Sequence, residues 1–277
     1  MIGISASSYY YRPKRARWGR EFEDADLRDA IECGADRASL QRLSNGTGVY
    51  LRRQGRRIGE RRIRRIMREF SLHAQIKQAF VCTTDSRHSH RVYPSLLTGR
   101  TVTGTDQVWA ADLTYIRIAN GFIYLEVILD LFSRRVIGWA ISKHIDAELA
   151  LSALRQAIQT RRPPAGCIHH SDRGVQYLCK AYVELLQQHH FLLSNSARGN
   201  PYHNAIVEQF MKTLKQEEVY LMNYQTYLDV LENLPRFIEE VYKEQRVYSR
   251  IGYLTPSELE NAIAVDPSIA RRFELQL

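Results

Sequence analysis

The sequence has no long hydrophobic run and few cysteines, and each absence excludes a class of protein. No run of about 18 apolar residues occurs in the chain, so no membrane-spanning helix is expected. The N-terminal MIGISASSYYYRPKR has no apolar segment of signal-peptide length, which disfavours secretion. The four cysteines form no CxxC pair, which disfavours a zinc knuckle or a disulfide framework and fits a cytoplasmic protein in a reducing compartment.

Positive charge is what the sequence has in excess, and it is confined to the first third of the chain. Of the 39 Lys and Arg and the 30 Asp and Glu, residues 1–100 hold 21 and 10, which leaves 18 and 20 for residues 101–277. A surface that is merely solvated usually mixes both signs, as the second part does. The imbalance therefore favours a nucleic-acid phosphate backbone as the partner of the N-terminal region.

The densest part of this basic region is RRQGRRIGERRIRRIMR at residues 52–68, with nine arginines in seventeen positions. Ile63, Ile66, Met67 and Phe70 recur at the spacing of one helical face, so we predict a helix that packs this face on a small core. The arginines off that face are predicted to contact DNA, with a plain solvated surface as the alternative. They are Arg61, Arg62, Arg64, Arg65 and Arg68.

Composition divides the chain into four parts. Residues 1–82 are predicted to be a basic helical DNA-binding region, and their opening GISASSYYYR is similar to the turn and second helix of a helix-turn-helix that lacks its first helix. Residues 83–106 are polar, contain glycine and proline and have no period, so we predict a linker. Residues 107–262 carry the patterns of a folded core, and residues 263–277 are a tail.

The core is predicted to be an α/β fold. Its first three strands are rich in β-branched and aromatic residues and follow one another closely, which favours an antiparallel meander. Helices and short strands then alternate, and this order predicts a mixed sheet flanked by helices. The elements are expected at residues 112–118, 121–133, 134–142, 146–160, 167–171, 180–190, 191–196 and 200–219.

Two aspartates stand at the ends of predicted strands. Asp112 opens the first strand, and Asp172 ends the fourth, directly after the polar stretch HHS. Ligand sites in α/β sheets favour strand ends. If these two strands are neighbours, both carboxylates emerge on one side of the sheet.

A third acid lies on the last predicted helix. At 100° per residue, the apolar side chains of this helix span an arc of about 140°, and Glu208 falls just outside its edge, between Lys212 and Lys215. The arc consists of Ile206, Val207, Phe210, Met211 and Leu214. Taken alone, the pattern is that of an amphipathic helix with Glu–Lys pairs on its exposed side.

The spacing of the three acids along the chain is informative as well as their positions on strands and helix. Asp172 follows Asp112 by sixty residues, and thirty-five residues separate Asp172 from Glu208. With this spacing, over residues 3–15 and 45–262, the chain resembles the bacterial insertion-sequence transposases with a retroviral-integrase-like DDE core. More narrowly, it resembles the downstream-frame product of the group whose transposase is made from two overlapping frames. The matching blocks are WAADLTYI, LDLFSRRVIGWAIS, HHSDRGVQY, SNSARGNPYHNAIVEQFMKTLK and YKEQRVYSRIGYLTPSELE.

The resemblance implies a ribonuclease-H-like core in which Asp112, Asp172 and Glu208 are the catalytic acids and metal ligands. It implies two Mg²⁺ ions, for which Mn²⁺ substitutes, because hard oxygen ligands select these metals over zinc. The implied reaction is phosphoryl transfer: water cuts the DNA at the element ends, and the freed 3′-hydroxyl attacks the target DNA. The implied partners are double-stranded DNA, further copies of the chain on that DNA and an upstream-frame protein, in the bacterial cytoplasm and at the nucleoid.

Residues near the acids receive supporting roles. Lys215 stands at the basic position that the family pattern has seven residues after its glutamate, and Arg173 and Lys212 are also predicted to contact DNA. His170 and Asn204 are predicted to support the acids, with simple packing as the alternative for His170. The rival functions are an element-end-binding partial product or regulator that does not cut DNA, and a stand-alone nuclease of the same fold.

Overall fold

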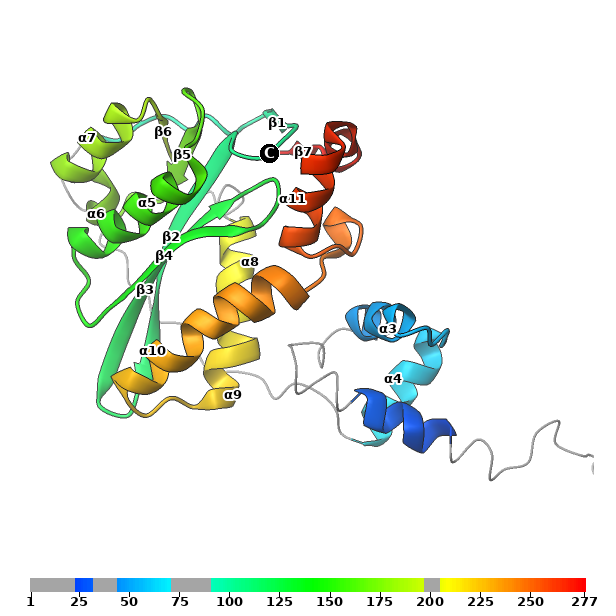
Figure 1. Ribbon diagram of the computed structural model, residues 1–277. Coiled ribbons are helices and arrows are strands. Elements are labelled where there is room, and N and C mark those ends of the chain that lie inside the picture. The colour runs from blue at the N-terminus through cyan, green and yellow to red at the C-terminus, as the bar shows by residue number, and fades with distance from the viewer. Residues whose placement is uncertain (1–22, 32–43, 71–90, 197–204) are drawn as a thin grey trace, which may run out of the picture. The chain divides into compact units, whose positions relative to one another are not determined.

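The computed structural model describes residues 23–31, 44–70, 91–196 and 205–277 (Figure 1). The chain forms two compact units, residues 1–75 and 76–277, and each is described by itself. The predictions for the helix-turn-helix-like N-terminus, for the first part of the linker and for Asn204 lie outside the described residues.

Three helices of the first unit share a small apolar core. They are residues 23–31, α3 (Ser44–Arg53) and α4 (Glu60–Glu69). Ile63, Ile66 and Met67 of α4 are buried, as the spacing predicts. The prediction was wrong for Phe70, because α4 ends at Glu69 and the ring is 42% exposed, with the guanidinium of Arg28 at 5.2 Å from its centroid.

The second unit is built on a five-stranded mixed sheet of order β4-β3-β2-β5-β6. The predicted meander is confirmed, because β3 pairs antiparallel with both β2 and β4, while β5 is parallel to β2 and to β6. A small second sheet pairs β1 with β7. The strands are β1 (Thr101–Val102), β2 (Val108–Ile118), β3 (Gly121–Asp130), β4 (Val136–Ser142), β5 (Ile168–Ser171), β6 (Leu192–Asn195) and β7 (Leu275–Gln276).

Helices cover both faces of the sheet. Trp109 and Ala111 of β2 pack with α5 (Ala147–Arg161), α6 (Val175–Leu178) and α7 (Lys180–Gln188), whereas Val108 and Ala110 belong to the core of the opposite face. This alternation is the period of two expected of a strand. The opposite face is covered by α8 (Ala205–Leu214), α10 (Tyr227–Arg236) and η4 (Phe237–Gln245). The predicted ribonuclease-H-like α/β fold is confirmed.

The remaining helical segments are short. They are η3 (Lys215–Val219), α9 (Tyr220–Met222), η5 (Ser249–Ile251), α11 (Pro256–Val265) and η6 (Pro267–Phe273). Within the described residues no helix is long and apolar enough to cross a membrane.

The last predicted helix changes its winding after α8. Its backbone continues into η3, a π-helical segment, and then into α9. The wider turn brings two acids inward, where Glu217 accepts hydrogen bonds from Arg246 at 3.1 and 3.2 Å and Glu218 accepts one from the Tyr224 hydroxyl at 2.6 Å. Alternating helix windings of this kind are frequent at functional sites.

Residues 91–106, in the second part of the predicted linker, lie against the core. The backbone N–H of Tyr93 donates to the Asn195 side chain, and that of Leu96 donates to the Ser194 hydroxyl, both at 2.9 Å. Leu97 is fully buried. The tail is attached at the same place, because β7 pairs with β1.

Candidate active site

The sheet places Asp112 and Asp172 on neighbouring parallel strands. In the pairing of β2 with β5, Ala110 lies opposite His170. Each aspartate is two residues beyond this last pair. Asp172 follows the end of β5, as predicted, but Asp112 lies inside β2, so the prediction that it opens its strand was wrong: residues 108–111 already pair with the neighbouring strands. Neighbouring strands lie about 4.8 Å apart. The adjacency on which the sequence prediction depended is therefore present.

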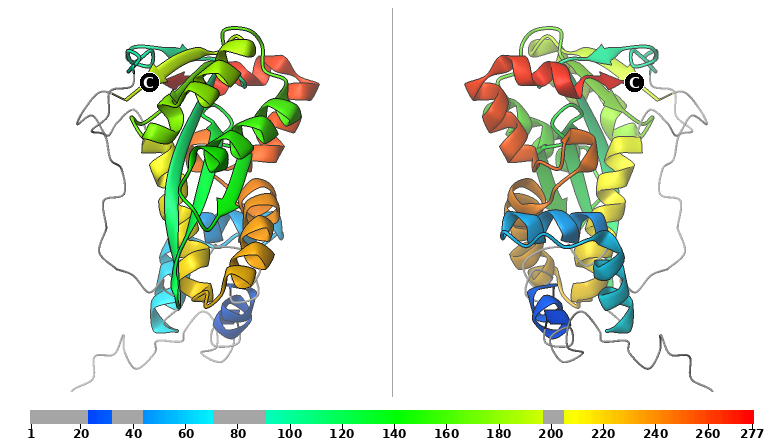
Figure 2. Two further views of the ribbon diagram at one scale, coloured as in Figure 1. Left: turned by 90° about the vertical axis from the view of Figure 1, so that its left-hand side faces the viewer. Right: turned by 90° about the vertical axis from the view of Figure 1, so that its right-hand side faces the viewer.

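Glu208 comes from α8, which packs against β2. Figure 2 shows α8 in yellow beside the long β2–β3 hairpin. Val207, Phe210 and Leu214 of the helix are buried, and Glu208 is exposed. The helical-face calculation thus placed the acid correctly at the border of the core.

The three acids are coupled through their charges. Burial, followed by the charges of Asp172 and Glu208, raises the pKa of Asp112 to about 8. The backbone N–H of Leu113 and the ammonium of Lys215 oppose this shift without cancelling it. Asp112 is therefore a neutral acid at neutral pH as long as no cation balances its neighbours.

The side chains do not converge into a ready-made metal site. Among the residues that the structure describes, no three His, Cys, Asp or Glu side chains lie close enough together to hold a metal ion as they stand. The donor set nevertheless fits a hard divalent cation, because it consists of carboxylate oxygens that raise one another's affinity for positive charge.

Glu126 is a site residue that sequence analysis missed. It lies in β3 with no exposed surface, and both of its carboxyl oxygens lie within hydrogen-bond distance of the Tyr177 hydroxyl, at 2.9 and 3.0 Å. Burial raises its pKa well above the usual range, and the charges of Asp112 and Asp172 add to that. The signal in the sequence is a single acid inside the apolar run FIYLEVIL.

The loop that carries Asp172 is fixed by its neighbours. The Asp172 carboxylate accepts the backbone N–H of Gly174 at 2.7 Å, and the Asn195 side chain donates to the Asp172 carbonyl at 3.2 Å. His170 is buried, and its ring nitrogens bond to the hydroxyls of Ser194 at 2.8 Å and Ser196 at 3.0 Å. These bonds fasten β5 to the β6 segment.

The three basic residues predicted near the acids differ from one another in exposure and in their contacts. Lys212 is exposed. Lys215 is half-buried, with its ammonium at 4.5 Å from the centroid of the Tyr115 ring, and burial lowers its pKa. Arg173 is half-buried and donates to the Ser196 carbonyl at 3.0 Å.

Within the first unit, three of the five predicted DNA-binding arginines have acidic partners. Asp24 accepts hydrogen bonds from Arg62 and from Arg65, and Arg64 pairs with Glu60 at 3.1 Å. The other two, Arg61 and Arg68, are exposed.

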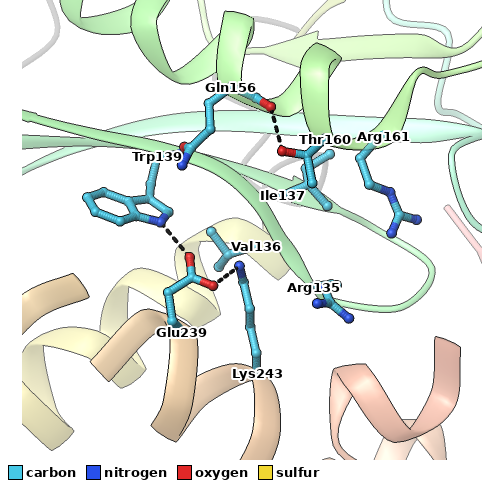
Figure 3. A pocket seen from close by; sticks show the side chains of 9 residues that line it. All are labelled: Arg135, Val136, Ile137, Trp139, Gln156, Thr160, Arg161, Glu239 and Lys243. Carbon is cyan, nitrogen blue, oxygen red and sulfur yellow. Dashed lines mark hydrogen bonds and ion pairs between the residues drawn. The ribbon is translucent and has the colours of Figure 1, made fainter. Parts of the chain in front are cut away.

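A pocket of about 340 Å³ lies between β4, α5 and η4, away from the three acids (Figure 3). Its charged groups are already matched. Glu239 accepts hydrogen bonds from the Trp139 indole at 2.8 Å and from Lys243 at 2.6 Å. Arg161 is held between Asp106 and Glu260. The pocket therefore shows no group that is ready to react.

The mixed sheet, with acids carried by two adjacent strands and a covering helix, defines an α/β protein with an integrase-like core. Two family models, each described as an integrase core domain, match residues 103–201 and 190–256.

Relatives identify the family. The chain is 33% identical to a 31 kDa protein of insertion element IS600 from Shigella sonnei, over 93% of this chain and 95% of that one. It is 35% identical to the transposase InsF of insertion sequence IS3A from Escherichia coli K12, over 76% of this chain and 74% of that one. The chain belongs to the insertion-sequence transposases with an integrase core domain.

Solved integrase cores are more distant. The catalytic core domain of HTLV-2 integrase in complex with magnesium is 21% identical with a TM-score of 0.40, covering 58% of this chain and 96% of that one. The catalytic core domain of BIV integrase is 19% identical with a TM-score of 0.44, covering 59% and 99%. The family assignment rests on the sequence relatives.

Neutralising Asp112 is expected to change the pH dependence of stability. Its folded pKa of about 8 exceeds the ordinary 3.8, so between these values the folded state binds a proton that the unfolded state does not. The free energy of unfolding therefore falls as pH rises through this window. In metal-free buffer, the melting temperature of Asp112→Asn should fall less than that of the wild type between pH 5 and pH 8.

The matched control is Glu184→Gln, which removes an exposed acid on α7 and should follow the wild-type pH profile. Parallel wild-type and Asp112→Asn profiles would contradict the raised pKa.

Proposed function

We propose that the chain is a transposase subunit that cuts DNA at the ends of an insertion element and joins those ends to target DNA. Membership of the family supports DNA transposition by polynucleotidyl transfer. The electrostatic coupling of Asp112 to Asp172 and Glu208, with the two aspartates on adjacent strands, supports this proposal.

The three carboxylates would hold divalent metal, with Mg²⁺ preferred and Mn²⁺ as a substitute. Drawn to about 4 Å from one another, they would repel by about 4 kcal/mol per pair at an effective dielectric near 20, so they can converge only around cations. When bound, two such ions would activate the attacking oxygen and stabilise the leaving oxygen of an in-line displacement. Asp112, Asp172 and Glu208 would be the residues that hold these ions.

The other residues of the site would bind and position the DNA. The ammonium of Lys215, whose charge acts on Asp112, would donate to the phosphate next to the reacting bond. The exposed Lys212, about one turn earlier on the helix, would contact the DNA backbone. Tyr177 and Glu126 would keep α6, and with it the Asp172 loop, against the sheet.

The first unit would supply affinity for DNA through its arginines. Arg61 and Arg68 are the best placed, because both are exposed, whereas Arg62 and Arg65 are engaged with Asp24. The proposal includes assembly of several copies on the element ends and a contribution from an upstream-frame protein.

The acids are tested one by one with the full chain, with and without the upstream-frame product. Asp112→Asn, Asp172→Asn and Glu208→Gln should each reduce Mg²⁺-dependent cleavage and strand transfer of a labelled element end by more than about a hundredfold. Each removes a charged ligand with little change in shape. Glu184→Gln, on the exposed surface of α7, should remain active. Wild-type activity in any of the three acid variants would remove that acid from the site.

The arginines are tested through the salt dependence of DNA binding. Replacing both Arg61 and Arg68 by alanine should reduce the slope of log K against log[salt] by about 2, because about one counterion is released per phosphate contact. The control replaces Arg271 and Arg272 by alanine. Both are also exposed, and their replacement removes the same charge from the second unit. An unchanged slope in the first variant, or an equal change in the control, argues against DNA contact by these arginines.

A further inference from the structure

The buried acid Glu126 lies on the face of the sheet opposite to Asp112. In the pairing of β2 with β3, Asp112 lies opposite Val127, and directly opposite side chains share a face. Val127 belongs to the core that α8 covers. Because side chains alternate along a strand, Glu126 and Ile128 point the other way, toward α5, α6 and α7. Glu126 is therefore not a candidate ligand of a metal that Asp112 holds.

A chain of hydrogen bonds nevertheless connects Glu126 to the carboxylate of Asp172. The Tyr177 hydroxyl lies 2.9 and 3.0 Å from the two carboxyl oxygens of Glu126. The backbone N–H of Tyr177 donates to the carbonyl of Gly174 at 3.1 Å. The backbone N–H of Gly174 in turn donates to the Asp172 carboxylate at 2.7 Å. The chain thus leads from a buried acid, through the start of α6, to a candidate metal ligand.

The buried end of this chain is held in a close-packed core. Glu126 has no exposed surface, and Tyr177 is 2% exposed. The Tyr177 ring packs edge to face against Tyr182, with the centroids 5.6 Å apart. Since interiors of this kind leave little free space, the position of the Tyr177 hydroxyl fixes the position of α6.

Glu126 acts in this chain as a neutral hydrogen-bonding group. One hydroxyl carries one proton, so both contacts with Tyr177 are full hydrogen bonds only when the carboxyl supplies a second proton. Burial raises the pKa of Glu126 well above its usual range against the opposing bond from Tyr177, and the charges of Asp112 and Asp172 raise it too. A glutamine amide also offers one donor and one acceptor to the hydroxyl, so Glu126→Gln keeps the chain.

We propose that Glu126 and Tyr177 are positioning residues of the acid site, which hold the Asp172 carboxylate through Gly174 in the orientation that binds a divalent cation. Partners that orient a metal ligand from behind commonly change metal affinity by about 10- to 100-fold when they are removed. The inference rests on the proposed function of the acid site and adds the residues that set its metal affinity.

The same face of the sheet contains a matched bond that takes another route. The Tyr182 hydroxyl lies 2.9 Å from Nε2 of His169, and both residues are buried. This bond joins α7 to β5 and does not pass through Gly174. Loss of the Tyr182 hydroxyl is therefore a control for the general cost of removing a buried hydrogen bond from this core.

The test measures the affinity of the full chain for Mn²⁺ by electron paramagnetic resonance without DNA, so that no cleavage is needed. Tyr177→Phe should raise the Kd for Mn²⁺ by about tenfold. Tyr182→Phe and Glu126→Gln should leave the Kd unchanged. Thermal melting should show similar losses for the two phenylalanine variants, so that a difference in Kd does not reflect stability.

Gly174→Pro breaks the chain at its other end and leaves the buried pair intact. Gly174 has a φ of −63°, which proline also adopts, and proline lacks the N–H that bonds to Asp172. This variant should also raise the Kd for Mn²⁺ by about tenfold, so the test does not depend on the folding of Tyr177→Phe.

An unchanged Kd in folded Tyr177→Phe or Gly174→Pro would overturn the inference. An equal rise in Tyr182→Phe, or a rise in Glu126→Gln, would also overturn it. Failure of the proposed function gives a different result. If Asp172→Asn does not weaken Mn²⁺ binding, the acids do not hold the metal and the proposed function fails. If Asp172→Asn weakens binding and Tyr177→Phe does not, only this inference fails.

Discussion

Repulsion between Asp112, Asp172 and Glu208 is the constraint on which the second unit depends. Parallel pairing of β2 with β5 brings the two aspartates to equivalent positions, and the packing of α8 on β2 adds the glutamate. The result is an acid with a pKa of about 8 at the surface of the core. Such an arrangement costs stability as the pH rises from 3.8 to about 8.

A second group of acids in the same unit consists of Asp106, Asp130 and Glu260, and these acids have hydrogen-bond and ion-pair partners within the protein. Asp130 is fully buried and accepts hydrogen bonds from the backbone of Ser133 at 2.8 Å and of Asp106 at 2.6 Å. Arg161 bridges Asp106 and Glu260 at 2.8 and 2.7 Å. There, Arg161 offsets Asp106 and Glu260, while burial raises the pKa of Asp130 to about 7. At the candidate site the nearby cation, Lys215, is the smallest influence on Asp112, which leaves the balance to ions and DNA.

The local periodicity of the sequence predicted much of the fold and part of the candidate site. The 100° steps of a helix placed Glu208 at the border of the core, and the end of a strand indicated Asp172, whereas Asp112 lies inside β2 and not at its start. The rest depends on contacts that no period reveals. Glu126 reads as one polar residue in a strand until Tyr177, fifty-one positions away, is seen to bond with it. Tyr93 and Leu96 lie in a stretch without a repeat because side chains of β6, rather than a regular backbone ladder, hold them.

Anomalous scattering from crystals of the full chain grown with Mn²⁺ tests the acid site most directly. We expect a manganese peak in contact with the carboxylates of both Asp112 and Asp172, with Glu208 turned toward the same place. Well-ordered crystals in which manganese binds elsewhere, while these carboxylates stay apart, would contradict it.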